Sequence, residues 1–209
     1  MDTATRIRAA RWADKDHVAA LIADALHPSP LATWLIPDPG PRRRILTDVL
    51  GIWIEHAMFY GDIHLTDDAA ATVGFHRYRS IPPPAHYQVR LADAAGPHTD
   101  RFDILDRLLA KARPTEPHYE LAFLAVRPSS TGAGHGTAML AHHRSRLDHV
   151  GLPSWTSTTS ASDLYRRYGY TLRPPIILPD GPTLHPMRRN PESDGHRLSV
   201  ITAQESRRA

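Results

Sequence analysis

A glycine-rich segment carries the strongest chemical signal in the sequence. It reads Val126-Arg127-Pro128-Ser129-Ser130-Thr131-Gly132-Ala133-Gly134-His135-Gly136-Thr137. The segment follows an apolar run at 119–126 and precedes a stretch with helical spacing to about Val150, so the pattern predicts a strand, a turn and a helix. Glycines let a ligand approach the backbone, and the first amides of a helix lack intrahelical acceptors and lie at the positive end of its dipole. The segment therefore predicts a site for phosphate oxygens.

Two other phosphate-binding motifs fit this segment poorly. A P-loop needs Lys followed by Ser or Thr after its last glycine, whereas Gly136 is followed directly by Thr137. A dinucleotide-binding fingerprint needs glycines spaced G-x-G-x-x-G near the start of a βαβ unit, and Thr137 stands where its last glycine would be. An ordinary glycine-rich loop stays open as an alternative at this point.

A second motif follows 29 residues after Gly136. Tyr165, Gly169 and Tyr170 are spaced as tyrosine, three residues, glycine and an aromatic residue, and a strand is expected between the two motifs at 154–159. In these residues the chain resembles the GNAT superfamily of N-acetyltransferases. The pattern is closest to that of puromycin N-acetyltransferase and its relatives, and the similarity is clearest from about 113 to 191.

The cofactor motif of this family runs Gln or Arg, two residues, Gly, one residue, and Gly or Ala. Gly134 and Gly136 occupy its glycine positions, but Thr131 replaces the long polar side chain at its start. Backbone amides do most of the pyrophosphate binding in the family, so the resemblance still implies acetyl-CoA as co-substrate. It implies as cofactor-binding residues Leu124, Ala125, Val126, Thr131, Gly132, Ala133, Gly134, Gly136 and Thr137. The amides of the first three would polarise the thioester carbonyl and pair with pantetheine.

Two residues match catalytic positions of the family. Tyr165 matches the general acid beside the thioester sulfur, and a phenol with a pKa near ~10 can donate a proton to a thiolate at neutral pH. Simple packing of Tyr165 in the core is the alternative. Glu120 aligns with the general base of the histone acetyltransferase branch, and strand alternation places it on the same face as Val126. Desolvation would raise the pKa of this glutamate. The alternative is a solvent-exposed Glu120, with a water chain as the base.

The resemblance also implies the GNAT fold, of class α+β. Its central sheet is mixed but mostly antiparallel, is flanked by helices, and splays between the strands at 119–126 and 154–159, where acetyl-CoA would lie. The adjacent strands in the pattern likewise favour α+β. We expect one domain at 1–191 and a polar, flexible tail at 192–209. The other expected elements are strands at 7–9, 63–66, 71–78, 170–178 and 183–188, and helices at 14–26, 41–60, 102–112 and 162–168.

Composition narrows the function classes. The 209 residues carry a formal net charge of +3 without a dense Lys/Arg run, which disfavours nucleic acid as a partner. The absence of cysteine excludes disulfides and thiolate nucleophiles, and the 14 histidines lack a metal-binding spacing, so no metal is expected. No apolar run reaches ~18 residues, so we expect no membrane span and a cytoplasmic location.

The expected function is acetyl-CoA-dependent transfer of acetyl to a primary amine of a small molecule, by direct attack on the thioester. An antibiotic or a related metabolite is one such amine. Two alternatives stay open, a non-catalytic acyl-CoA-binding sensor module and a protein or peptide N-acetyltransferase, because one fold supports many functions. The oligomeric state is also open between monomer and homodimer.

Overall fold

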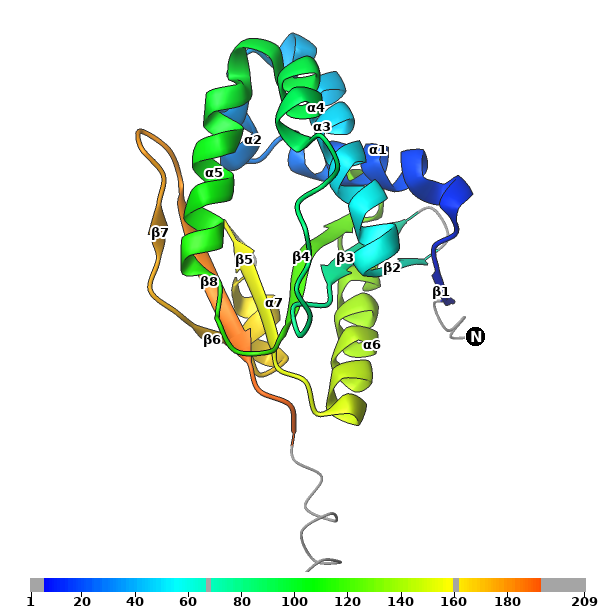
Figure 1. Ribbon diagram of the computed structural model, residues 1–209. Coiled ribbons are helices and arrows are strands. Elements are labelled where there is room, and N and C mark those ends of the chain that lie inside the picture. Colours follow the sequence, from blue (N-terminus) through cyan, green and yellow to red (C-terminus); the bar gives the residue numbers. More distant parts are fainter. Residues whose placement is uncertain (1–5, 67–68, 160–161, 193–209) are drawn as a thin grey trace, which may run out of the picture.

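A mixed sheet forms the centre of the molecule. The computed structural model describes residues 6–66, 69–159 and 162–192, and the strands follow the order β1-β2-β3-β4-β5-β8-β6, with β7 paired to β8 (Figure 1). Their bounds are β1 (Ile7–Ala9), β2 (Gly61–Thr66), β3 (Ala70–Phe75), β4 (Tyr119–Val126), β5 (Ser154–Thr158), β6 (Thr171–Leu172), β7 (Ile176–Ile177) and β8 (Thr183–Arg189). Of these pairs, β4 and β5 run parallel and the others antiparallel. The predicted α+β class and mostly antiparallel sheet are confirmed.

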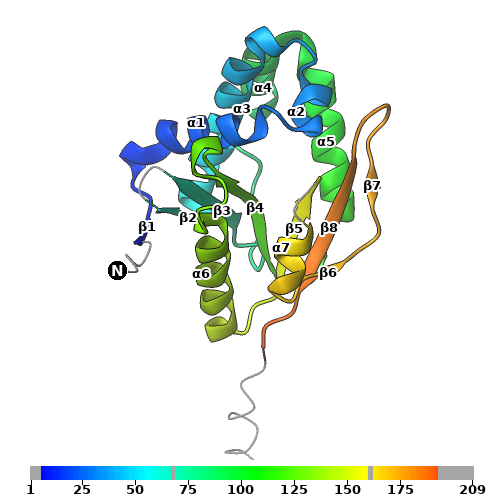
Figure 2. The ribbon, with the colours of Figure 1, turned by 180° about the vertical axis from the view of Figure 1, so that it is seen from behind.

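Helices cover both faces of the sheet (Figures 1 and 2). The helices are α1 (Lys15–Leu26), α2 (Pro30–Leu35), α3 (Pro39–Tyr60), α4 (Tyr87–Ala95), α5 (Thr99–Ala112), α6 (His135–Val150) and α7 (Ser162–Arg167). The larger core joins α1 to α5 to one face, through side chains such as Ile22, Leu50 and Phe102. A smaller core on the opposite face joins α6 and α7 to β4 and β8, through Leu140 and Tyr165.

Two helices that begin in or after proline-rich segments were not predicted from the sequence pattern. No helix is expected between 26 and 41, but Pro30 begins α2, because a proline in the first turn of a helix has no amide that would need an acceptor. Ser29 caps this helix, its Oγ accepting from the Ala32 amide at 3.1 Å. In the same way α3 begins at Pro39 and not at Pro41, and Asp38 Oδ1 accepts from the Gly40 amide at 2.9 Å. The helix α4 follows the second proline-rich segment, at 82–84.

Two predicted strands are longer than the ones observed. The strand expected at 71–78 ends at Phe75. The strand expected at 170–178 is divided into β6 and β7, because Pro174 and Pro175 lie between them and prolines cannot donate to a ladder.

Residues 193–209 of the tail predicted at 192–209 lie outside the described residues. Its first predicted residue, Glu192, is described, and its backbone amide donates to Asp148 Oδ1 at 2.9 Å. Within the described parts of the chain, no helix is long and apolar enough to cross a membrane.

Candidate active site

The parallel strands β4 and β5 separate part-way along their length. They pair at three positions, from Tyr119 opposite Ser154 to Leu121 opposite Thr156. Beyond this point β4 continues to Val126 while β5 ends at Thr158. The register therefore confirms the predicted splay, and it leaves the β5-facing edge of β4 unpaired with β5 from Ala122 onward.

A β-bulge lies on β4 where the splay begins. Val73 of β3 pairs with Phe123 and Gly74 pairs with Leu121, so Ala122 is an extra residue on β4. A bulged residue is left out of the ladder and changes the alternation of the side chains that follow. As a result Leu121 and Leu124 face the smaller core with α6 and α7, while Phe123 and Ala125 face the larger one.

The bulge corrects one prediction about Glu120. Strict alternation placed Glu120 and Val126 on the same face of the sheet. Val126 instead lies against the start of α6, with its Cγ2 3.4 Å from the position of a Cβ on Gly136, whereas Glu120 lines a cavity on the opposite face. Because of the extra residue between them, Glu120 and Val126 lie on opposite faces of the sheet and not on the same face.

The glycine-rich turn lies at the end of β4 and leads into α6. Gly132 and Gly134 have φ angles of +85° and +84°, which glycine adopts without the strain that a side chain would bring. A Cβ on either residue would meet no heavy atom within 4 Å, so the space above the turn is open. The amide of Ala138 donates to Gly134 O at 2.9 Å, and the amides of the preceding helical residues have no intrahelical acceptor. The turn thus presents amide donors beside the open end of the splay.

Tyr165 lies on α7 at the base of the splay. Its ring packs against Tyr170 at a centroid distance of 5.4 Å, and only 6% of the residue is exposed. Burial raises the pKa of its hydroxyl to about 12, although a hydrogen bond with the neighbouring Thr156 side chain lowers this pKa. Thr156 Oγ1 in turn donates to the Leu121 carbonyl at 2.9 Å. Tyr165 is therefore protonated at neutral pH and lies beside the last paired residues of β4 and β5.

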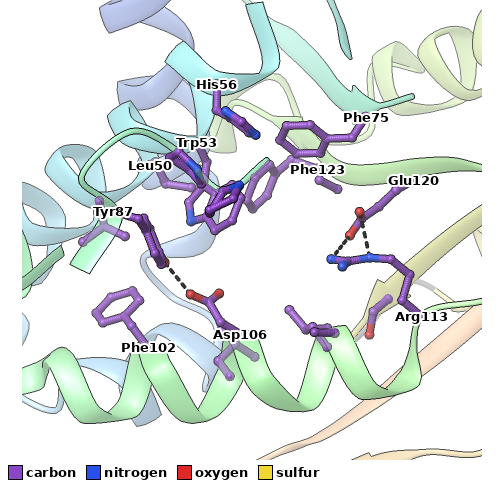
Figure 3. Close-up of a pocket in the computed structure, with 18 of the residues that line it drawn as sticks. Leu50, Trp53, His56, Phe75, Tyr87, Phe102, Asp106, Arg113, Glu120 and Phe123 are labelled. Carbon is purple, nitrogen blue, oxygen red and sulfur yellow. Dashed lines mark hydrogen bonds and ion pairs between the residues drawn. The ribbon is translucent and has the colours of Figure 1, made fainter. Parts of the chain in front are cut away.

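A cavity of about 480 Å³ opens on the other face of the splay. Figure 3 shows aromatic side chains of the lining from α3, β3, α4, α5 and β4, and β5 contributes a further one. Most of the lining is apolar, and its aromatic members are Trp53, Phe75, Tyr87, Phe102, Phe123 and Trp155. The volume and the apolar lining are typical of pockets for small molecules.

Glu120 lies at one end of this cavity and is paired with two arginines. Arg77 Nε donates to its Oε2 at 2.5 Å, and Arg113 Nη2 donates to its Oε1 at 3.1 Å (Figure 3). Arg113 Nε lies 3.1 Å from Oε2, close enough for an ion pair but without hydrogen-bond alignment. Glu120 is 6% exposed, so the alternative of a solvent-exposed carboxylate is wrong. Both carboxylate oxygens are engaged by guanidinium groups, so a proton donor in the cavity would compete with two arginines for Glu120.

The comparisons with known proteins identify the fold. No protein-family model matches the sequence. The structure resembles the crystal structure of a histone acetyltransferase HPA2 and related acetyltransferase from Corynebacterium glutamicum, with a TM-score of 0.69 and 24% identity over 90% of this chain and 97% of that one. The chain has the GNAT fold.

Two further GNAT-fold structures match over similar lengths. Arylalkylamine N-acetyltransferase 2 from Aedes aegypti has a TM-score of 0.59 and 12% identity, over 88% of this chain and 98% of that one. The ribosomal-protein-S18-alanine N-acetyltransferase from Escherichia coli has a TM-score of 0.51 and 14% identity, over 91% of this chain and 96% of that one. By their names, one of these proteins acts on small amines and the other on a protein, so the likeness leaves the acceptor of this chain undecided.

One acidic residue in the GNAT-fold cavity was missed by the sequence analysis. Asp106 extends from α5 toward the cavity and accepts a hydrogen bond from the Tyr87 hydroxyl (Figure 3). Burial raises the pKa of Asp106 to about 6, with Asp103 and Glu120 contributing in the same direction. In the sequence, Asp106 is one of three aspartates between 100 and 106, on or directly before the helix predicted at 102–112, and nothing distinguishes it from its neighbours. Only the packing of α5 against α4 shows which of them is buried.

Proposed function

We propose that this protein is an acetyl-CoA-dependent N-acetyltransferase that acetylates a primary amine of a small molecule. The observation that carries the proposal is the arrangement around the splay. The glycine-rich turn lies at its open end, Tyr165 at its base, and an apolar cavity on its far face. Acetyl-CoA that enters from the turn and an acceptor amine that enters from the cavity would meet between β4 and β5.

The residues of the turn fit the pyrophosphate of acetyl-CoA. Gly132 and Gly134 leave open space above the backbone, and the amides at the start of α6 supply donors at the positive end of the helix dipole. We assign the pyrophosphate to the amides of Thr131, Gly132, Ala133, Gly134, Gly136 and Thr137. The exposed hydroxyl of Thr131 replaces the longer side chain of related motifs, so the backbone supplies most of the binding.

The edge of β4 fits the pantetheine and the thioester. From Ala122 onward this edge is unpaired with β5, so the backbone near Leu124, Ala125 and Val126 is available to an extended ligand. An amide at or beside the bulge would donate to the thioester oxygen as negative charge develops on it, which is the usual role of an oxyanion hole.

The reaction requires two proton movements. The acceptor must lose one proton from its ammonium group before its nitrogen can attack the carbonyl carbon. The C–N bond then forms, the C–S bond breaks, and the second proton passes from the nitrogen to the leaving sulfur. We assign Tyr165 to the sulfur, because its hydroxyl lies at the base of the splay and stays protonated. Glu120 remains a candidate for the first proton, although its two arginine partners favour another residue.

The pKa of Tyr165 indicates how it would act. An alkyl thiol has a pKa near ~8.5, and burial raises that of Tyr165 to about 12. Complete transfer of its proton to a thiolate of that pKa would therefore be unfavourable. Donation of a hydrogen bond to the developing thiolate has no such cost. We infer that Tyr165 stabilises the leaving group by hydrogen bonding and that the final proton of the thiol comes from the acetylated nitrogen.

The cavity supports a small-molecule acceptor over a peptide. Its aromatic lining converges from six elements on a space of about 480 Å³, which suits a compact ligand. An amine-bearing antibiotic belongs to this class of acceptor.

The absence of cysteine makes the test direct. Because the protein has no thiol of its own, a thiol reagent reports only the free CoA that acetyl transfer releases. Acetyl-CoA is incubated with a panel of small primary amines, a peptide with a free N-terminus, and no acceptor. Amine-dependent release of CoA supports the proposal. Tight binding of acetyl-CoA with no release for any amine would favour the sensor module, and release only with the peptide would favour a peptide acetyltransferase.

A further inference from the structure

The cavity has two charged ends of different character. At one end Glu120 carries one negative charge against the two positive charges of Arg77 and Arg113, which leaves a net positive charge. At the other end lies Asp106, about two turns of α5 before Arg113, and the hydrogen bond that it accepts comes from the neutral hydroxyl of Tyr87. A cationic group in the cavity is therefore repelled at the Glu120 end and attracted at Asp106.

The position of Asp106 places it opposite the bulge of β4. The helix α5 and the strand β4 run in opposite directions (Figure 1). Both contribute residues to the cavity lining, and Arg113, directly after α5, reaches Glu120 of β4 at 3.1 Å. Asp106 lies seven residues before Arg113, or roughly 10 Å along a helix that rises 1.5 Å per residue. The same distance along a strand at ~3.3 Å per residue reaches from Glu120 to about Phe123. Asp106 thus lies across from the residues where the splay opens.

The walls beside Asp106 are aromatic. Tyr87 holds the carboxylate, and the ring of Trp53 packs on that of Tyr87 at a centroid distance of 5.1 Å. Phe102 lies one turn earlier on α5, and Phe123 projects from β4 into the same space (Figure 3). Flat, rigid walls of this kind favour an aromatic or other compact apolar body over a hydrated polar chain.

From these observations we propose that the cavity binds a primary amine carried on an aromatic or compact apolar body, with its ammonium group at Asp106. Asp106 holds the ammonium and takes its first proton, so that the neutral nitrogen can attack the thioester. The proton then passes to solvent, and Asp106 returns to its charged form. This inference rests on the proposed acetyltransferase function for its chemical step, but the binding part can be tested without acetyl transfer.

Binding at Asp106 should depend on pH. The charged and titratable groups around it are Tyr87 on α4, Asp103 and Arg113 on α5, Glu120 on β4, and His56 and Arg77 across the cavity. Because burial raises the pKa of Asp106 to about 6, the carboxylate is charged at pH 7.5 and becomes neutral below pH 6. Affinity for a cationic amine should therefore fall about tenfold per pH unit below about 6. Tyr87→Phe removes a hydrogen-bond donor that lowers the pKa of Asp106, so the loss of amine affinity should occur at a higher pH in this variant.

The test compares two ligands of the same shape in the full chain with CoA present. Calorimetry at pH 7.5 is expected to show that 2-phenylethylamine binds at least tenfold more tightly than the neutral 2-phenylethanol. Asp106→Asn should remove this preference. Asp103→Asn changes a carboxylate one turn earlier, outside the cavity lining, and should keep the preference for the amine. Because Asp103 raises the pKa of Asp106, this variant should lose its amine affinity at a slightly lower pH than the wild type.

Three results would overturn the inference. They are equal binding of the amine and the alcohol, a preference for the amine that survives Asp106→Asn, and no binding of either ligand at millimolar concentration. The proposed function fails on a different observation, namely an intact amine preference with no release of CoA from acetyl-CoA. Circular dichroism of Asp106→Asn and Tyr87→Phe checks that both variants are folded.

Discussion

Replacement of Tyr165 by Phe removes one hydroxyl from the base of the splay and little else. The ring keeps its packing on Tyr170, and Thr156 keeps its hydrogen bond to the Leu121 carbonyl. We expect the free energy of unfolding to change by less than about 1 kcal/mol, since a single neutral hydrogen bond contributes about that much. The variant should therefore be folded and should bind acetyl-CoA within a few-fold of the wild type.

The expected loss of activity follows from the pKa of Tyr165. Since burial raises this pKa and keeps the hydroxyl protonated, the hydroxyl contributes one hydrogen bond to a charged leaving group. Such bonds contribute ~1.5–3 kcal/mol, which corresponds to a loss of about 10–150-fold in kcat. This range lies at or below the ~10²–10⁴-fold usual for full general acid catalysis.

The assay measures kcat, KM and the dissociation constant for acetyl-CoA in matched variants. Tyr168→Phe is the control, because its ring packs against the edge of the same core while its hydroxyl makes an exposed hydrogen bond to the Thr137 carbonyl at 3.2 Å. The Tyr165→Phe loss should appear in kcat, with binding unchanged, while Tyr168→Phe should retain kcat within about threefold. A kcat close to the wild-type value would refute the role of Tyr165 at the sulfur. A large loss of acetyl-CoA affinity with kcat preserved would make it a binding residue.

Four further changes test other parts of the account. Gly134→Glu places a negative charge at the phosphate site and strains a backbone with φ +84°, so calorimetry should show at least a tenfold loss of CoA affinity; unchanged affinity in a folded variant would exclude the turn as the site. Glu120→Gln should leave the pH dependence of kcat/KM in place if Asp106 is the base, and abolish its acidic limb if Glu120 is. Gly181→Ala brings a Cβ to 2.6 Å from Trp34 Nε1, which itself donates to the Pro179 carbonyl. Denaturant unfolding should therefore show a destabilisation of about 1–3 kcal/mol, and a neutral result would mean that the β7–β8 loop can move away from α2 without cost. For Asp106, a pKa raised from 3.8 to about 6 means that the fold loses stability as pH rises from about 3.8 to about 6, because the unfolded chain gives up this proton first. Asp106→Asn should therefore be more stable than wild type by up to ~3 kcal/mol at pH 8 and by almost nothing at pH 4, and a gain that does not grow over this range would contradict the raised pKa.

The parts of the fold that depend on local signals could be predicted from the sequence. The strand β4, the glycine-rich turn and the helix α6 were predicted together, because apolar runs, positive-φ glycines and helical spacing are properties of neighbouring residues. The splay between β4 and β5 followed from the resemblance to the GNAT superfamily, and the register confirms it. The helices α2 and α4 were missed because prolines near their starts were interpreted as breakers.

The parts that depend on contacts between distant segments could not be predicted. The bulge at Ala122 arises from the pairing of β4 with β3 and leaves no mark in the sequence of β4 itself. The surroundings of Glu120 were unpredictable for the same reason, because Arg77 is 43 residues away in sequence. Asp106 is buried only because α4 packs beside α5 and brings Tyr87 against it. The roles of Tyr165, Glu120 and the glycine-rich turn remain predictions until the variants are measured.

The most direct test of the account follows both products of one reaction. Acetyl-CoA and 2-phenylethylamine are incubated with the wild-type protein, free CoA is titrated as thiol, and the amine is examined by mass spectrometry. The account predicts one N-acetylated amine for each CoA released, with both products lost in the Gly134→Glu variant. Release of CoA without an acetylated amine, or binding of acetyl-CoA without either product across the whole amine panel, would contradict it.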